Sequence, residues 1–370
     1  MRTLSGAAAD PRPPQRRILH PLADDEVLPV DPDRPDAALI AHAAAIIRSG
    51  GLVAFPTETV YGLGADGLNP TAVARIFEAK GRPPTDPLIL HIAELEALSE
   101  LVQAVPPAAQ KLAHHFWPGP LTFVLPKRPV VPDLVTAGLP TVAVRMPAHP
   151  VALALIRAAQ TPIAAPSANR FGHTSPTTAQ HVLDDLEGRI DLILDGGPTP
   201  VGVESTVLDL TGPVPTILRP GGLPREAIEA LVGPVALQVH IPEGPAPSPG
   251  MLLKHYAPRA EMVFLQGSVD WMRATMQELI ARYTAEGHRV GVLIAEEDRE
   301  ALMGLPVEVI VLGPEGDLET IARRLYEGLR ELDSRGLSLI LARDFGEQGL
   351  GLAVRDRLTR AAGGRVLRAP

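Results

Sequence analysis

Three short stretches of the chain combine residue types and spacing that suit binding of a charged small molecule. They are "FPTETVYGLGADG" (residues 55–67), "KGRPPTDPLILHI" (80–92) and "APSANRFGHTSPT" (165–177). Two arginines, Arg145 in "VAVRMP" and Arg219 in "ILRPGG", also follow strand-like runs. A turn needs glycine, but it does not need this density of hydroxyl, amide and charged groups. The stretches therefore predict a site that holds a ligand.

Each stretch also has a purely structural interpretation. Lys80 and Arg82 would complement a helix dipole, Ser175 and Thr177 would cap a helix, and Arg145 would be a solvated strand-end charge. Taken together, however, the stretches place cationic and hydroxyl groups after five predicted strands, where open α/β sheets bind ligands. Guanidinium groups, hydroxyls and backbone N–H groups around a crevice suit a polyphosphate. No Gly-x-x-x-x-Gly-Lys-Ser/Thr motif occurs, so the phosphate site would be of another type.

Several other chemistries are excluded by the sequence. The chain has no cysteine, no Ser-His-Asp order with a nucleophile elbow and no His-Glu-x-x-His motif. The pair His114-His115 reads as core or surface, and Asp184-Asp185 as a solvated helix face. Charge-stabilising donors without a nucleophile favour positioning chemistry, such as nucleotidyl transfer between two bound substrates.

Hydrophobic periodicity predicts the elements that position these groups. A helix that begins near Asp36 and ends at Gly50-Gly51 precedes a strand to Phe55, and Asn69-Pro70 opens a helix to Lys80. Further strands are predicted at 87–92, 121–125, 141–146, 162–166, 191–195, 205–210 and 214–219. Further helical stretches are predicted at 94–115, 150–160, 177–186 and 224–232. The adjacent strands near 205–219 indicate antiparallel pairing and hence a mixed sheet.

The pattern divides the chain into four parts. We expect a disordered leader (1–34), a catalytic domain (35–233), a proline-rich linker (234–258) and a smaller C-terminal domain (259–370). The last part alternates strands and helices in the order strand 261–266, helix 269–286, strand 289–295, strand 307–312, helix 317–334, strand 338–344 and helix 350–362. That order is typical of a Rossmann-like α/β unit, although no Gly-x-Gly-x-x-Gly turn follows its first strand.

Composition restricts the partners and the compartment. With 370 residues, 21% charged residues and a net charge of −9, the chain has the composition of a globular protein without a nucleic-acid-coating surface. It carries no signal peptide and no apolar run of membrane-spanning length, which predicts a cytoplasmic protein. Only two asparagines occur, Asn69 and Asn169. Helix capping explains the first and leaves the second without a structural role.

The same stretches resemble the YrdC/Sua-five family, the threonylcarbamoyl-AMP synthases. "FPTETVYGLGADG", "KGRP…DPLILHI", "PSAN…SPT", "ESTVLD" and "ILRPG" occur in the family's order, and Lys80-x-Arg82 with Ser167-x-Asn169 matches its signature motif. The linker sequence "SPGMLLKHYAP" and the α/β unit after it resemble the two-domain form. The resemblance implies a YrdC-like twisted mixed sheet with flanking helices, followed by a smaller Rossmann-like domain.

The resemblance also implies an activity and its residues. L-Threonine, bicarbonate and ATP, with Mg²⁺, would give threonylcarbamoyl-AMP and pyrophosphate, and other proteins would pass the threonylcarbamoyl group to adenosine 37 of tRNAs that read ANN codons. A weak tRNA contact and no membrane contact are expected. Lys80 and Arg82 would be catalytic. The ATP site would comprise Arg82, Asp86, Thr141, Ser167, Asn169, Ser175, Arg219 and Tyr256, with Tyr256 as a lid. The threonine site would comprise Thr59, His91, Arg145, Ala165 and Ser205.

Two features depart from the family pattern, and two other functions compete. A carboxylate at Asp86 is awkward beside phosphates unless it faces the ribose or a metal, and the leader is longer than the family needs. Carbamoyl transfer in hydrogenase maturation uses a similar domain, but within a protein that carries cysteine zinc motifs. A non-catalytic RNA-binding module would need a local basic patch on an acidic chain.

Overall fold

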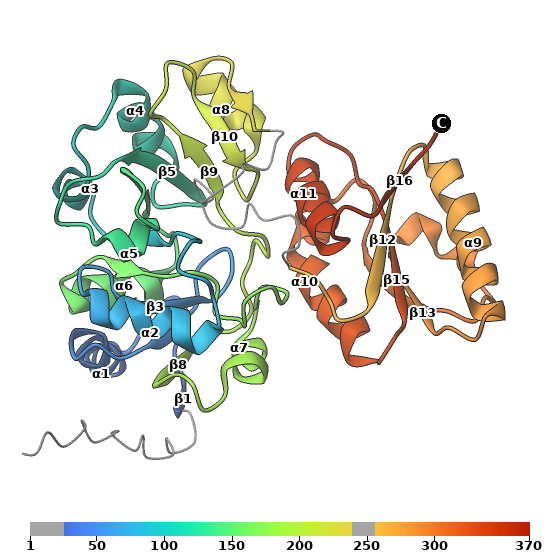
Figure 1. Cartoon of the computed structure of the whole chain (residues 1–370), viewed down its shortest axis with the longest axis horizontal. Helices are drawn as coiled ribbons and strands as arrows, with labels where there is room; N and C mark the ends of the chain where they lie inside the picture. The colour runs from blue at the N-terminus through green and yellow to red at the C-terminus, as the bar shows by residue number, and fades with distance from the viewer. Residues whose placement is uncertain (1–25, 239–255) are drawn as a thin grey trace, which may run out of the picture.

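The computed structural model describes residues 26–238 and 256–370, which form two α/β units side by side (Figure 1). The first unit contains an eleven-stranded sheet in the order β1-β8-β2-β3-β7-β4-β6-β5-β9-β10-β11, and the second a five-stranded sheet in the order β14-β13-β15-β12-β16. In Figure 1 the helices α10 (Leu318–Ser334) and α11 (Gly351–Ala361) lie on the side of the second unit that faces the first. Several contacts between the units involve these two helices, among them those of Tyr326 and Arg357 with Glu204.

The first unit is a mixed sheet with flanking helices, as predicted. Its strands are β1 (Glu26–Pro29), β2 (Val53–Phe55), β3 (Gly62–Asp66), β4 (Ile89–His91), β5 (Leu121–Pro126), β6 (Thr141–Arg145), β7 (Ile163–Ala164), β8 (Leu192–Asp195), β9 (Thr206–Asp209), β10 (Thr216–Arg219) and β11 (Ala236–Leu237). Its helices are α1 (Ala37–Arg48), α2 (Pro70–Lys80), α3 (Glu96–Leu101), α4 (Pro107–Phe116), α5 (Asp133–Thr136), α6 (Pro150–Ala159), α7 (Ala179–Leu186) and α8 (Arg225–Val232). Strands β9 and β10 pair antiparallel, which confirms the prediction of a mixed sheet.

The caps of the first two helices follow the sequence signals. Asp36 accepts hydrogen bonds from the N–H groups of Ala38 and Leu39 at the start of α1. Asn69 accepts from Thr71 and Ala72 at the start of α2, and Gly81 ends that helix with φ 63°. The predicted capping role of Asn69 is confirmed.

The predicted disordered leader is wrong for residues 26–34. Residues 26–29 form β1, which pairs in parallel with β8 from Glu26–Leu192 to Pro29–Asp195. Leu28 and Val30 pack against apolar side chains of α1 and α6. Pairing with a strand far along the chain satisfies this backbone, and a local sequence pattern does not reveal such a partner.

Only part of the stretch 55–67 is a loop. Residues 62–66 form β3, antiparallel to β2, with Phe55 opposite Gly62. A Cβ atom on Gly64 would lie 2.7 Å from the Phe55 ring and 2.8 Å from Ile163. The glycines that suggested a turn therefore allow close packing inside a strand.

Two other element predictions need correction. The helical stretch 94–115 is two helices: α3 ends at Leu101, where Val102 is extended and forms a β-bridge with Lys127, and α4 begins with proline in its first turn. The predicted linker start at residue 234 is also too early, because Ala236–Leu237 forms β11 against β10. Residues 239–255 of that linker lie outside the described residues.

The second unit matches its prediction closely. Its strands are β12 (Glu261–Gln266), β13 (Val290–Ala295), β14 (Glu308–Gly313), β15 (Leu339–Arg343) and β16 (Val366–Arg368), and its remaining long helix is α9 (Val269–Ala285). All pairs in this sheet are parallel. Two short 3₁₀ turns, not an α-helix, connect β13 to β14. The edge strand β16 is the one strand here that the sequence analysis missed.

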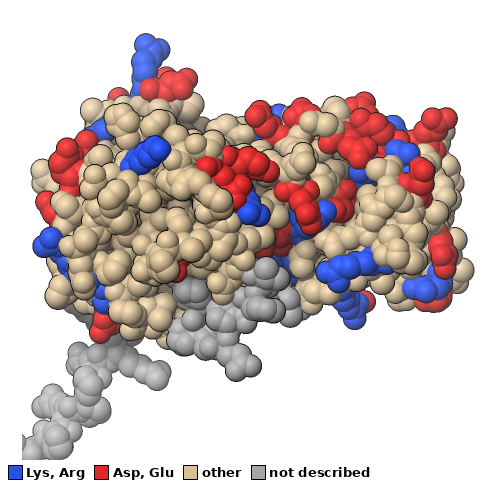
Figure 2. Space-filling model, turned by 90° about the horizontal axis from the view of Figure 1, so that it is seen from above, with Lys and Arg blue, Asp and Glu red and all other residues tan. Residues whose placement is uncertain are grey.

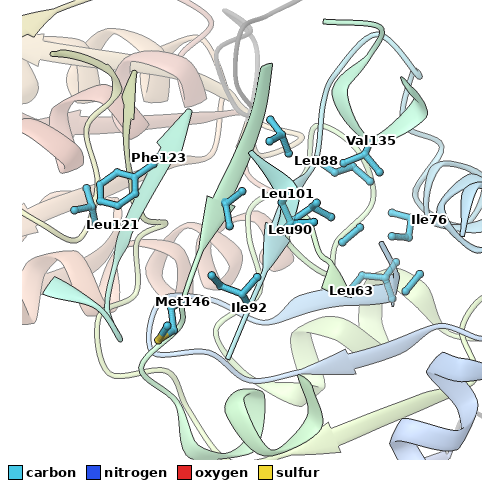
Figure 3. Close-up of a cluster of buried hydrophobic side chains, with 14 of the residues drawn as sticks. Leu63, Ile76, Leu88, Leu90, Ile92, Leu101, Leu121, Phe123, Val135 and Met146 are labelled. Atoms are coloured by element: carbon cyan, nitrogen blue, oxygen red, sulfur yellow. The ribbon is translucent and has the colours of Figure 1, made fainter. Parts of the chain in front are cut away.

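One large apolar cluster supports the first sheet. Leu63, Leu90, Phe123 and Met146, from four strands or strand ends, belong to it together with Ile76 of α2 (Figure 3). Burial of this much apolar surface is the main favourable term in folding. Among the described residues, none of the helices has the length and apolar content needed to span a lipid bilayer.

Candidate active site

A pocket with about 510 Å³ of space, part of it open to solvent, lies where β2, β4, β6 and β9 end or begin, and Tyr256 forms part of its wall. We call it the central cavity. Its lining comprises Thr57, Thr59, Val60, Gly62, Arg82, Ile89, His91, Arg145, Ala165, Pro166, Ser167, Glu204, Ser205, Arg219 and Tyr256. Residues from all three stretches quoted above, and both strand-end arginines, therefore meet at one place.

Arg145 organises one half of the central cavity. Its Nη1 donates to the Thr59 hydroxyl at 3.0 Å, and its Nη2 lies 2.6 Å from a Glu58 carboxylate oxygen. The Thr57 hydroxyl lies 2.8 Å from that of Thr59 and also donates to the carbonyl of Val60 at 2.6 Å. For Glu58 the sequence leaves two roles open, orienting a cationic side chain or contacting the ligand, and in the structure it pairs with the arginine. The guanidinium is 4% exposed, so it is held ready for a small anion such as a carboxylate.

Arg82 lies in the other half of the central cavity. It donates to the carbonyls of Asp86 (3.1 Å) and Pro87 (2.7 Å), and its Nη2 is 2.9 Å from the Asp86 carboxylate. Burial raises the pKa of Asp86, and the charge of Arg82 opposes that rise. Asp86 therefore holds the arginine that lines the cavity and is not itself in the lining.

Lys80 supports the loop that follows β7. Its ammonium group donates to the carbonyls of Ser167 and Asn169, both at 2.5 Å. Burial lowers the pKa of Lys80 well below its ordinary value, and the nearby charge of Arg82 adds to this effect. The two parts of the signature motif are thus in direct contact. Ser167 belongs to the cavity lining, and Lys80 lies behind it, outside the lining.

Asn169 has one satisfied and one unsatisfied end. Its amide nitrogen donates to the carbonyls of Arg170 (2.8 Å) and His173 (2.9 Å). Its Oδ1 is buried and has no hydrogen-bond partner among the described residues. A buried acceptor without a partner is uncommon and indicates a place for a ligand or an ordered water.

Arg219 joins the two halves through Ser205. It donates to the Ser205 carbonyl at 2.9 Å and to its hydroxyl at 3.3 Å, and that hydroxyl lies 2.7 Å from Thr122. Ala165 reaches the cavity from β7, where its N–H donates to the Ile89 carbonyl at 3.0 Å. Ala165, Ser205 and Arg219 all belong to the cavity lining, and their roles in binding an amino acid or a nucleotide stay predictions.

Four predicted ATP residues, Asp86, Thr141, Asn169 and Ser175, do not line the central cavity. Ser175 donates to Glu204, a lining residue, at 2.5 Å. Thr141 begins the strand that ends at Arg145, and its place in an ATP site stays a prediction. Sequence reasoning missed the role of Glu204, although that residue lies inside the quoted "ESTVLD" motif.

His91 is a neutral part of the lining. It follows Leu90 in β4 and is the register partner of Arg145 in β6, and its Nδ1 lies 3.3 Å from the Ile89 carbonyl. Burial, and secondly the charge of Arg145, lower the pKa of His91 to about 3. The imidazole therefore carries no charge near neutral pH.

We expect the His91 ring signals in an NMR titration to stay constant between pH 5 and 8. The unfolded imidazole takes up a proton below about 6.5, whereas the folded one does so only near 3. Protonation thus favours the unfolded chain, and this residue's contribution to stability is lost as the pH falls from about 6.5 towards 3. The urea-unfolded protein, in which the ring should titrate normally, is the control. A midpoint between pH 6 and 7 in the folded protein would refute this assignment.

Comparison with known proteins agrees with this geometry. Residues 45–221 match the family described as "Telomere recombination", and residues 223–363 match "Threonylcarbamoyl-AMP synthase, C-terminal domain". Threonylcarbamoyl-AMP synthase of Pyrococcus abyssi is 51% identical over 333 residues, covering 89% of this chain and 95% of the relative. The chain belongs to the threonylcarbamoyl-AMP synthase family.

Two further similarities support the assignment of this threonylcarbamoyl-AMP synthase family member. The Bacillus subtilis threonylcarbamoyl-AMP synthase is 49% identical over 336 residues, covering 89% of this chain and 94% of the relative. The crystal structure of P. abyssi Sua5 complexed with L-threonine superposes with a TM-score of 0.88 at 49% identity, over 93% of this chain and 99% of that one. Family membership makes this chain an enzyme of the nucleotidyltransferase type, with the mixed sheet and second α/β domain that the motifs implied.

Proposed function

We propose that the central cavity condenses L-threonine, bicarbonate and ATP into threonylcarbamoyl-AMP and pyrophosphate. The observation that carries the proposal is the division of one cavity into two differently built halves. Arg145, with Glu58 and Thr59, presents a buried guanidinium for a carboxylate, while Arg82 and Arg219 present two more guanidinium groups beside Ser167. Two cationic sites that share one cavity suit an amino acid and a nucleotide that must react with each other.

In the threonine half, Arg145 would take the substrate carboxylate. Thr59, Ser205, His91 and Ala165 would enclose the side chain and the amine. A neutral His91 can exchange hydrogen bonds without repelling the ammonium group of threonine. The threonine carbamate is a weak, short-lived nucleophile, and a closed cavity would shelter it from water until it meets the α-phosphate.

In the ATP half, Arg82 and Arg219 would bind the phosphates and stabilise the charge that develops on pyrophosphate. Lys80 would hold the loop of Ser167 and Asn169 in register, and Asp86 would fix Arg82. Ser175 and Thr141 would contribute to nucleotide binding, and Tyr256 would cover the bound nucleotide.

Mg²⁺ would accompany the ATP. Among residues 26–238 and 256–370, no group of three or more histidine or acidic side chains could hold a metal by itself. The buried Oδ1 of Asn169 is an oxygen acceptor of the kind that Mg²⁺ or its water ligands prefer. We therefore propose that Asn169 would meet the ion, whose chemistry is to neutralise phosphate charge.

The product would pass to proteins that modify adenosine 37 of tRNAs reading ANN codons, and we propose the cytoplasm as the location. In the view of Figure 2, acidic side chains gather on the C-terminal unit, with lysine and arginine side chains among them. That face offers little for a phosphate backbone, so any tRNA contact would be weak and would lie elsewhere.

The direct test is pyrophosphate release from ATP by the full chain, with L-threonine and bicarbonate each supplied or withheld. We expect release only when both are present, and threonylcarbamoyl-AMP should form in equal amount. Release that ignores threonine would point to another acceptor. A folded protein with no release under any condition would refute the synthase proposal.

A further inference from the structure

A buried ionic cluster joins the two units beside the central cavity. Arg357 of α11 is 0% exposed, and its Nε donates to a Glu204 carboxylate oxygen at 2.7 Å. The Tyr326 hydroxyl of α10 donates to the same carboxylate at 2.8 Å. On its other side, Glu204 accepts from the Ser175 hydroxyl at 2.5 Å and lines the cavity. One carboxylate therefore connects the second unit to the ATP half of the site.

The same arginine contacts the residue that covers the cavity. The Arg357 guanidinium carbon lies 5.1 Å from the centre of the Tyr256 ring, within the range of a cation–π interaction. On another side, the Tyr326 ring centre is 5.7 Å from that of Tyr256. The Arg357 guanidinium and the Tyr326 ring thus both contact Tyr256, which lines the central cavity.

Tyr256 depends on such contacts to keep its conformation. Its φ of 61° lies in the left-handed region, which costs a residue with a side chain about 1 kcal/mol or more. It is nevertheless 1% exposed and belongs to the apolar cluster of the second unit. Packing against Tyr326 and Arg357 offsets the backbone cost and fixes the ring where it closes the cavity.

The charged groups of this cluster contribute more to fixing the positions of its side chains than to holding the two units together. A buried ion pair is often no more stabilising than an apolar pair of the same size, and the interface already has apolar contacts at Val60 and Val203. A carboxylate with three directional partners, in contrast, sets the position of each of them. Arg357 and Arg219 lower the pKa of Glu204 to about 2 against the opposing effect of burial, so the carboxylate stays charged at neutral pH.

We propose that Arg357 is a positioning residue of the ATP site, acting through Glu204 and Tyr256, so that the C-terminal unit supplies part of the active-site geometry. This inference rests on the proposed function, which identifies the half of the central cavity around Arg82 as the ATP site. It assigns a task in that site to a residue 153 positions away from its partner Glu204 in the chain.

The test compares Arg357→Met with Arg330→Met. Arg330 is a matched control, because it also lies on α10 and is paired with Asp185 of the first unit at 2.7 Å. Within residues 26–238 and 256–370, it forms no hydrogen bond, ion pair or ring contact with Glu204 or Tyr256. Arg357→Met should raise the KM and the calorimetric Kd for ATP about tenfold and leave the KM for threonine within about twofold. Arg330→Met should change each value by about twofold or less.

Two further variants separate positioning from folding. Arg357→Met leaves Glu204 as an unpaired buried charge, whereas Glu204→Gln/Arg357→Met removes both charges. The double variant should therefore recover the melting temperature of the wild type and still show the ATP defect. In a Tyr256→Leu background, Arg357→Met should have little additional effect, because the two residues act as one unit.

Equal ATP defects in Arg357→Met and Arg330→Met, or a full additional loss in the Tyr256→Leu background, would overturn the inference. A wild-type enzyme that shows no threonine-dependent pyrophosphate release would refute the proposed function instead. The calorimetric ATP Kd would still report on Arg357 in that case, so the two failures are distinguishable.

Discussion

Replacing Arg82 with alanine is expected to lower threonine-dependent pyrophosphate release about a thousandfold. Arg82 is 6% exposed and lines the central cavity with its fork held by Asp86 and two backbone carbonyls. A cation fixed in this way before the substrate arrives needs no rearrangement to stabilise charge on the leaving pyrophosphate. Initial rates at saturating threonine and bicarbonate measure the effect.

Two companions make the Arg82 experiment specific. Arg82→Lys keeps the charge but not the planar fork, so it should recover only a small part of the rate. Arg75→Ala is the matched control, because Arg75 lies on α2, pairs with Asp191 at 2.9 Å and is not in the cavity lining. A folded Arg82→Ala enzyme whose rate stays within about threefold of the wild type would remove Arg82 from the catalytic set.

Replacing Arg145 with methionine is expected to weaken L-threonine binding about a hundredfold or more. The guanidinium is 4% exposed and has Glu58 and Thr59 as partners, so an incoming carboxylate would meet a desolvated, oriented donor. Loss of one member of such a pair commonly costs about 2–5 kcal/mol. Threonine titrations by calorimetry without ATP give the dissociation constant directly.

Threoninol, which lacks the carboxylate, identifies the group that Arg145 recognises. The wild-type enzyme should prefer threonine strongly, whereas Arg145→Met should bind both ligands with similar, weak affinity. Glu58→Gln/Arg145→Met removes the orphaned carboxylate and separates binding from folding. Arg157→Ala, an exposed arginine that pairs with Glu94, is the control. Undiminished preference for threonine in the Arg145 variant would place the carboxylate elsewhere.

Local signals predicted most of the elements that position the site. The caps at Asp36 and Asn69, the alternating second unit and the antiparallel β9–β10 pair all follow from short-range patterns, and the structure contains each of them. The errors share a physical cause. β1 forms because β8 lies beside it, and β3 accepts its glycines because Phe55 needs the space. Neither condition is visible within a window of ten residues.

The residues of the site also differ in whether the local sequence reveals their role. Motif residues such as Thr59, Arg82 and Arg145 could be grouped because hydroxyl and cationic residues follow several predicted strands, and all three line the central cavity. Glu58 and Glu204 could not be assigned, because a glutamate beside a motif reveals nothing about which arginine it will hold. Arg357 carried no signal at all: within "AVRDRLTR" it reads as one more charge on a helix. Its meaning arises only when two separately folded sheets meet.

The contacts of Glu204 with the second unit affect when the site is completed during translation. A ribosome makes the chain from its N-terminus, and N-terminal domains generally fold first. The first sheet can therefore assemble before Tyr326 and Arg357 are made, while Glu204 still lacks both of its partners in the second unit. A nascent chain would thus carry nearly every catalytic motif and yet give Glu204 its partners Tyr326 and Arg357 only after the second unit has been made.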